Sequence, residues 1–206
     1  MSQFDFSQND FSELYTLFDA DTLNKLASCY ENGIGNEKNI DTAIKLYTLS
    51  ANQDNSNAQY NLARCYENGI GIDKNINKSI ELFTLAANQG LADAQYHLAF
   101  FYENGTNLTQ DISKAFELYS LAANQGDINA QIYLANCYAN GIGVEKDILK
   151  AIDFYTLAAN QGNIDAQYYL AHYYENGIGV KKNITKAVKL YTLAANVRVI
   201  LMLNII

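Results

Sequence analysis

The sequence predicts an all-α solenoid, in which helix pairs stack side by side, from two observations. The chain repeats itself every 36 residues about five times without insertion or deletion, and each copy carries apolar residues at helical spacing. The repeat is marked by alanines (Ala58, Ala94, Ala130, Ala166), tyrosines (Tyr30, Tyr66, Tyr102, Tyr138, Tyr174) and glycines (Gly33, Gly69, Gly105, Gly141, Gly177). A fixed period of this size is typical of an array in which each unit buries its neighbour.

The first helix of one copy is predicted over roughly residues 56–67. Its apolar residues share one face: Ala58, Leu62, Cys65 and Tyr66. Asn55 is a predicted N-cap, because its side chain can accept a hydrogen bond from a free backbone N–H. Gly69 follows the last turn, where a residue with positive φ ends a helix, and Gly71 continues a tight loop.

A second helix is predicted to begin after Asn75, whose counterparts are also good N-caps: Asn39, Asp111, Asp147 and Asn183. Its apolar face is formed by Ile76, Ser79, Ile80, Phe83, Ala86 and Ala87. Glycines end three of these helices (Gly90, Gly126, Gly162), while Asp54 takes that place in the first copy. In the third loop Asn107 replaces a glycine, and we expect the loop path to survive because asparagine tolerates left-handed backbone.

Small residues are expected where helices cross closely, as at Ala63 and its counterparts Ala27, Ala99, Ala135 and Ala171. One helix pair cannot bury both of its faces, so neighbouring pairs must stack.

The charge of the chain excludes some partners. Formal net charge is −8, from 22 acidic against 14 basic side chains. Nucleic acids and anionic membranes need a basic surface, so we expect neither as a partner. The N-terminus lacks the pattern of a signal peptide, and no stretch approaches about 18 apolar residues. A cytoplasmic location is therefore expected.

The three cysteines, Cys29, Cys65 and Cys137, share one repeat position. Equivalent residues of stacked helices lie about 10 Å apart, too far for a disulfide. We expect small buried thiols in a reducing compartment. Clustered Cys and His ligands for zinc are absent from the sequence, and no metal or cofactor is expected.

The repeat resembles the Sel1-like repeat family, a relative of the tetratricopeptide repeat. The resemblance rests on Ala130, Leu134, Tyr138, Gly141, Gly143, Val144, Asp147, Lys150, Ala151, Ala158, Ala159 and Gly162, in that order, and covers about residues 22–196. Each copy departs from the family pattern by Leu-Ala in place of Leu-Gly, and the proline often seen before the Asp is missing. The resemblance implies a right-handed α-solenoid of about five antiparallel helix pairs that binds other proteins, as family members do in quality control, cell-wall control and virulence.

The predicted organisation has three parts. Residues 1–21 are interpreted as a partial repeat or N-terminal capping helix that starts at Asn9 or Asp10. Five repeats follow, at 22–57, 58–93, 94–129, 130–165 and 166–196. The apolar tail 197–206 leaves the repeat frame. It is interpreted as the mark of a fragment or altered reading frame, or as a short helix that docks on the last face.

Two columns on the first helices change chemistry from copy to copy. They are predicted to line a concave groove: Lys25, Asn61, His97, Tyr133 and Tyr169 in one column, and Ser28, Arg64, Phe100, Asn136 and His172 in the other. A mixture of aromatic and polar groups suits an extended peptide or a partner protein. The alternative is a solvated face without a ligand.

We predict no catalytic residue. His97 and His172 lie in different columns, and no nucleophile or carboxylate partner recurs beside them. The predicted function is a monomeric interaction scaffold or adaptor. One alternative is a hydrolase of the β-lactam-cleaving kind reported for some secreted family members, although those carry two bridged cysteines per repeat. The other is a structural fragment without a ligand.

Overall fold

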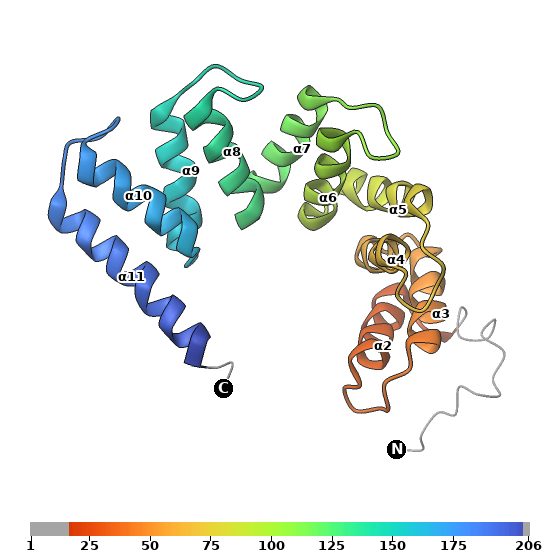
Figure 1. The fold of residues 1–206 in the computed structure, drawn as a ribbon. Helices are drawn as coiled ribbons and strands as arrows, with labels where there is room; N and C mark the ends of the chain where they lie inside the picture. Colours follow the sequence, from red (N-terminus) through yellow and green to blue (C-terminus); the bar gives the residue numbers. More distant parts are fainter. Residues whose placement is uncertain (1–16, 204–206) are drawn as a thin grey trace. The chain divides into compact units, whose positions relative to one another are not determined.

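The computed structural model describes residues 17–203, and the side chains of residues 17–195. Within that range the chain forms ten helices and no strand, so the predicted all-α solenoid class is confirmed (Figure 1). The first helices of the repeats, called A helices, are α2 (Ala20–Asn32), α4 (Ser56–Asn68), α6 (Ala92–Asn104), α8 (Ile128–Asn140) and α10 (Ile164–Asn176). The second, or B helices, are α3 (Ile40–Ala51), α5 (Ile76–Asn88), α7 (Ile112–Asn124), α9 (Ile148–Asn160) and α11 (Ile184–Leu203).

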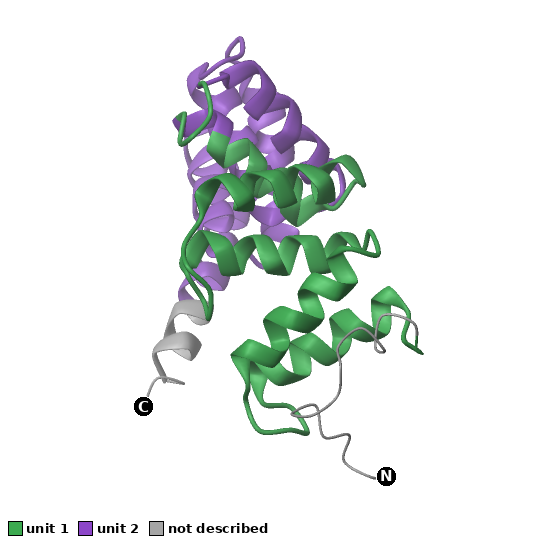
Figure 2. Cartoon of the chain, turned by 90° about the vertical axis from the view of Figure 1, so that its right-hand side faces the viewer, with its two compact units in different colours: residues 1–101, 105–109 green, residues 102–104, 110–206 purple. Residues whose placement is uncertain are grey.

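The chain divides into two compact units, which are described separately (Figure 2). Unit 1 comprises residues 1–101 and 105–109, and unit 2 comprises residues 102–104 and 110–206. In both units an A helix pairs with the B helix that follows it, as in α4 with α5 and α8 with α9. The next A helix then packs on that pair, as α4 does on α3 and α10 does on α9.

The helices begin where the predicted caps stand. Asn55 Oδ1 accepts from the Ala58 N–H at 2.9 Å, and Asn75 Oδ1 accepts from the Lys78 N–H at 3.1 Å. The same bond occurs at Asn39, Asp111, Asp147 and Asn183. α6 is the exception, since Leu91 holds its N-cap position and makes no side-chain cap bond. The capping prediction is thus confirmed for every B helix.

Left-handed backbone ends the A helices and shapes the loops. Gly69 has φ 69° and its N–H reaches the Cys65 carbonyl, as predicted. Asn107 takes φ 55° in the place of a loop glycine, and Asp54 takes φ 59° in the place of Gly90. The loop path therefore survives both replacements, because Asn and Asp are the non-glycine residues that enter this region most readily.

The core of each unit lies between one helix pair and the A helix that covers it. In unit 1, Leu46 and Tyr47 of α3 pack with Ala58 and Leu62 of α4. In unit 2 the matching set is Tyr155, Ala158 and Ala159 of α9 with Ala166 and Leu170 of α10. The predicted close crossings are confirmed, since Ala63 and its four counterparts are fully buried.

A buried glutamine supports each junction between repeats. Gln131 donates to the Ala123 carbonyl at 3.2 Å, and its Oε1 accepts from Gln161 at 3.0 Å. Gln59 makes the same two bonds, with the Ala51 carbonyl and with Gln89. Gln167 donates to the Ala159 carbonyl at 3.3 Å, but its buried Oε1 has no partner among the described residues. The matching position 197 holds valine instead of glutamine.

The two ends differ from the repeats. Most of the predicted capping segment 1–21, including Asn9 and Asp10, lies outside the described residues; within the rest, Asp19 caps α2. At the other end, the backbone of residues 197–203 continues α11 as one helix. Among the described residues, no helix is both long and apolar enough to cross a bilayer.

Candidate interaction surface

In unit 1 the predicted site residues are carried by α2, α4 and α6. Lys25 and Phe100 are exposed, and the others are half-buried: Ser28, Asn61, Arg64 and His97. Asn61 donates to Asn24 of the preceding A helix at 3.2 Å. Arg64 lies 6.0 Å from the centroid of the Tyr60 ring, within reach of a cation–π contact. Asn61 therefore joins neighbouring A helices and still reaches solvent.

His97 is half-buried and lies among aromatic and charged neighbours. Its ring stacks on Phe83 of α5, with centroids 4.9 Å apart and planes 11° apart. Nε2 lies 3.3 Å from the Tyr60 hydroxyl, and Nδ1 lies 3.8 Å from a carboxylate oxygen of Glu67. Burial lowers the pKa of His97, and Arg64 acts in the same direction against the opposing pull of Glu67 and Asp93. The neutral imidazole is favoured at this position.

The contact between Glu67 and His97 goes with a difference on the B helix α5: the second repeat has phenylalanine where three other repeats have a tyrosine that binds a glutamate. In three hairpins a B-helix tyrosine donates its hydroxyl to an A-helix glutamate: Tyr47 to Glu31 at 2.6 Å, Tyr119 to Glu103 at 2.8 Å and Tyr191 to Glu175 at 2.9 Å. In the second repeat the tyrosine is Phe83, which has no hydroxyl. Glu67 faces His97 instead. The sequence already shows phenylalanine in the place of tyrosine, but its consequence can be inferred only once the tyrosine and glutamate positions are known to be in contact.

In unit 2 the predicted site residues are mostly aromatic. Tyr133 stacks on Tyr119 with centroids 3.9 Å apart, and Tyr169 stacks on Tyr155 at 5.2 Å. Asn136 is tied down, because its Oδ1 accepts the Tyr155 hydroxyl at 2.6 Å. His172 is exposed. Burial raises the pKa values of Tyr133 and Tyr155 well above the usual range, so both stay neutral.

The first column has a packing role that its variability concealed. His97, Tyr133 and Tyr169 each stack on the aromatic residue of the preceding B helix. The residue type in that column therefore varies partly because different aromatic rings can stack at this position, and not only because the position is exposed. In the second column, Phe100 and His172 project into solvent.

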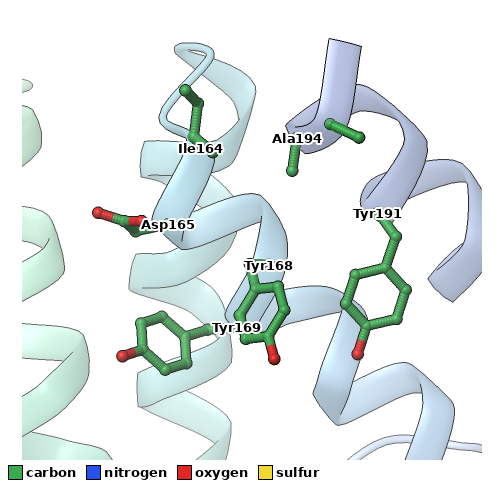
Figure 3. A pocket seen from close by; sticks show the side chains of 7 residues that line it. Ile164, Asp165, Tyr168, Tyr169, Tyr191 and Ala194 are labelled. Atoms are coloured by element: carbon green, nitrogen blue, oxygen red, sulfur yellow. The ribbon is translucent and has the colours of Figure 1, made fainter. Parts of the chain in front are cut away.

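Sequence reasoning missed a hollow in unit 2, between α10 and α11 (Figure 3). It encloses about 540 Å³ and is lined by Ile164, Asp165, Tyr168, Tyr169, Tyr191, Ala194 and Ala195. Of these only Tyr169 was predicted as a site residue. The available signal was the departure of residues 197–206 from the repeat pattern.

The thiols are placed for packing. Cys29, Cys65 and Cys137 form no disulfide, as predicted. Burial raises the pKa of Cys65 to about 11 and also raises that of Cys137, which keeps both thiols protonated and weakly nucleophilic. Among the described residues, no group of three or more His, Cys, Asp or Glu side chains is placed to hold a metal ion.

The fold and these surfaces define the class of protein: a helical-repeat array whose A helices present aromatic and polar side chains. A model of the Sel1 repeat matches residues 20–55, 56–91, 92–127, 128–163 and 164–196. The chain therefore belongs to the Sel1 repeat family. The matched repeats start two residues before the predicted 22–57 frame and keep its period. Members of this family commonly serve as protein-interaction modules, and the fold is generally a non-catalytic scaffold.

Solved structures agree with this family. The chain is similar to a Sel1 repeat protein from Oxalobacter formigenes, with 32% identity, a TM-score of 0.82, and coverage of 90% of this chain and 76% of that one. It is also similar to c5321, a protective antigen of uropathogenic Escherichia coli, at 33% identity and a TM-score of 0.77, covering 90% of this chain but 40% of that one. Helicobacter pylori cysteine rich protein B shares 24% identity and a TM-score of 0.50 over 63% of this chain and 92% of that one, which shows likeness of fold alone. Comparison with curated protein sequences found no match.

Proposed function

We propose that the protein is an interaction scaffold or adaptor whose A helices form a concave groove for a partner protein or an extended peptide. The observation that carries the proposal is the second column. Phe100 is 47% exposed although it is a large aromatic side chain, and exposed aromatic residues beside arginine are typical of binding hot spots. Arg64 sits one copy before it in that column. The family's general role in protein–protein interaction supports the same proposal.

Each unit contributes its own chemistry to the proposed groove. Lys25, Arg64 and His97 make the unit 1 surface polar and capable of contacting acidic groups. Tyr133 and Tyr169 make the unit 2 surface a set of rings with polar edges, on which apolar or proline-rich segments pack well. An acidic partner segment suits the unit 1 surface, and an apolar segment suits the unit 2 surface.

Site-specific photo-crosslinking tests the proposal. A crosslinking amino acid is placed at Phe100 or Tyr169, and at two control positions of similar exposure on B helices, Leu85 (50%) and Leu157 (47%). Captured proteins are identified by mass spectrometry in extracts at native salt. We expect Phe100 and Tyr169 each to capture a specific partner, and the controls to capture neither. Equal capture at all four positions would show that the A-helix face is only a solvated surface.

A variant pair then tests the charge of the groove. Lys25→Glu combined with Arg64→Glu should weaken capture of an acidic partner while the melting temperature stays nearly unchanged, because Lys25 is exposed and Arg64 half-exposed. Unchanged capture would remove the acidic partner from the proposal.

We also propose that the protein catalyses no reaction and binds neither nucleic acid nor membranes. We further propose that it is a monomer in the cytoplasm. Two features support the first proposal: the net charge of −8, which disfavours polyanions, and the raised pKa values of the Cys65 and Cys137 thiols. Serine- and thiol-directed activity probes should leave the purified protein unlabelled. Saturable labelling at one residue would favour a hydrolase.

A further inference from the structure

We propose that the face of unit 2 formed by α10 and α11, around the hollow in Figure 3, binds an α-helix of a partner protein. The helix carries the pattern of this chain's own A helices: alanine, then leucine four residues later, then cysteine or an aromatic residue three residues after that. This surface shares Tyr169 with the first column, but no residue of the second column, which carries the proposed groove function, lines the hollow.

The interface between α9 and α10 shows how such a face is covered. Tyr155, Ala158 and Ala159 of α9 are buried against α10, which contributes Ala166 and Leu170. Tyr169 of α10 also stacks on Tyr155. Unit 1 repeats the arrangement, with Tyr47 and Ala51 of α3 buried against Ala58 and Leu62 of α4. Side chains at equivalent repeat positions thus pack against an A helix in each unit.

A shift of 36 residues places the same side chains around the hollow. Tyr191, Ala194 and Ala195 of α11 correspond to Tyr155, Ala158 and Ala159 of α9. Tyr155 is 1% and Ala159 is 8% exposed, whereas Tyr191 is half-exposed and Ala195 is exposed. Figure 3 shows the Tyr168 and Tyr191 rings side by side along this opening. The face therefore continues the established interface, and among the described residues no helix covers it as α10 covers α9.

The covered copies specify which helix fits. Its alanine must be small, because Ala58, Ala94, Ala130 and Ala166 are fully buried at the crossing. Its leucine matches a column that is at most 5% exposed in four copies: Leu62, Leu98, Leu134 and Leu170. The third place matches the buried Cys65, Phe101 and Cys137. A β-branched residue at the alanine position would overpack the crossing.

A second copy of this chain is a poorer occupant than a foreign helix. Its first A helix, α2, offers Leu26 and Cys29 at the second and third places. At the crossing place it offers Thr22, which is β-branched and larger than alanine. The proposal therefore commits to a partner protein's helix.

A helical peptide tests the proposal on the full chain. The probe is a labelled, hydrocarbon-stapled peptide with the sequence of residues 127–142, which contains Ala130, Leu134 and Cys137; the staple holds the helix, since a free peptide of this length is barely helical. Fluorescence anisotropy should show saturable binding. A peptide with Leu134→Asp should bind at least about tenfold more weakly, because it would bury a charge.

Two protein variants locate the binding. Ala195→Arg places a charge on the proposed face and should weaken binding about tenfold or more, while Leu193→Arg, at an exposed position two residues away on α11, should leave it unchanged. Both positions are exposed, so circular dichroism and melting temperature should match the wild type. The proposal would be overturned if the peptide did not bind saturably, or if the Ala195→Arg and Leu193→Arg variants bound it equally well.

Analytical ultracentrifugation of the protein without peptide tests whether a second copy of the chain, instead of a partner's helix, covers the face. Concentration-dependent association that Ala195→Arg removes would show that a second copy covers the face, and would also overturn the proposal. Crosslinking from Phe100, in unit 1, reports the groove function separately. Its persistence in Ala195→Arg would show that the two surfaces act independently.

Discussion

The fourth and fifth hairpins of the array, α8–α9 and α10–α11, carry nearly the same pattern of residues but differ in how much of it is buried. Tyr155 of α9 is buried, while its counterpart Tyr191 of α11 is half-exposed. Among the described residues, α10 covers the fourth hairpin and no helix covers the fifth in the same way. Burial in this fold is therefore set by the neighbouring repeat as much as by the residue itself.

Hydrogen bonds also differ between the two hairpins, because one residue differs within the hairpin itself. The Tyr155 hydroxyl donates to Asn136, because the place of the usual glutamate holds Ala139. The Tyr191 hydroxyl keeps the glutamate, Glu175. Desolvation and that neighbouring carboxylate together raise the pKa of Tyr191 to about 12. A single substitution thus gives a buried hydroxyl a different hydrogen-bond partner.

The largest difference is expected from removing the two tyrosines. Tyr155→Ala should lower the free energy of unfolding by about 3–5 kcal/mol, because it leaves a cavity between α9 and α10. Tyr191→Ala should cost less than half as much, because the ring has less buried surface to lose. Urea denaturation followed by circular dichroism measures both. Equal losses would mean that the fifth hairpin is covered in solution.

Two loop glycines give the next largest contrast, in unit 1. Gly71 has φ 64°, and a Cβ added there would collide with Ile40 of the preceding B helix. Gly35 has φ 74°, but a Cβ there would meet nothing within 4 Å among the described residues. Gly35→Ala should cost about 1–2 kcal/mol from backbone strain alone. Gly71→Ala should cost a further 1–3 kcal/mol, roughly, because Ile40 must move.

The melting temperatures of these two variants separate strain from contact, since both residues have left-handed backbone. If Gly71→Ala is no worse than Gly35→Ala, the loop does not pack on the preceding hairpin as described.

The buried glutamines give a smaller contrast. Gln131→Met removes two hydrogen bonds and leaves the Gln161 amide and the Ala123 carbonyl without this partner, at a cost of about 1–3 kcal/mol. Gln167→Met removes one bond together with an acceptor that had no partner among the described residues, and should cost about 1 kcal/mol or less. Chemical denaturation of the two variants measures the difference. A larger loss for Gln167→Met would show that its Oε1 is satisfied in solution.

The sequence predicts the local elements well because their causes are local. Asn55 and Asn75 cap helices through a bond to a residue three positions away, and Gly69 ends one through its own φ. The pattern also predicts the buried alanines, since each recurs at the same helical face. It did not predict that Tyr133 and Tyr169 stack on B-helix rings, because that requires the register between two helices.

The hollow beside Tyr191 was missed for a different reason. Its residues repeat a pattern that is buried elsewhere, so the pattern itself predicts a core. What differs is that no described helix packs on this face, and packing between repeats is a property of the stack and not of the local pattern. The two columns were found by their variability, which identified the A-helix face but could not distinguish Asn136, tied to Tyr155, from the exposed His172.

The smallest predicted effect concerns pH and the first column, where His97 occupies the place that Tyr133 and Tyr169 hold in unit 2. Because the folded-state pKa of His97 is lowered, the unfolded chain binds a proton more readily than the folded chain below about pH 6.5. Stability should therefore fall as pH drops through about 6.5 towards the lower folded-state pKa, and be unaffected by this group above about pH 7.5.

The variant His97→Tyr copies the unit 2 residue and should flatten the pH dependence of the melting temperature between about pH 7.5 and 5, whereas His172→Tyr, at an exposed position, should not. The groups that face His97 are Glu67, Arg64, Asp93 and the Tyr60 hydroxyl. Glu67 could compensate by stabilising an imidazolium across the 3.8 Å gap. In that case stability would rise on acidification and His97→Tyr would remove the gain, which would show that the ion pair outweighs burial and that the first column tolerates charge.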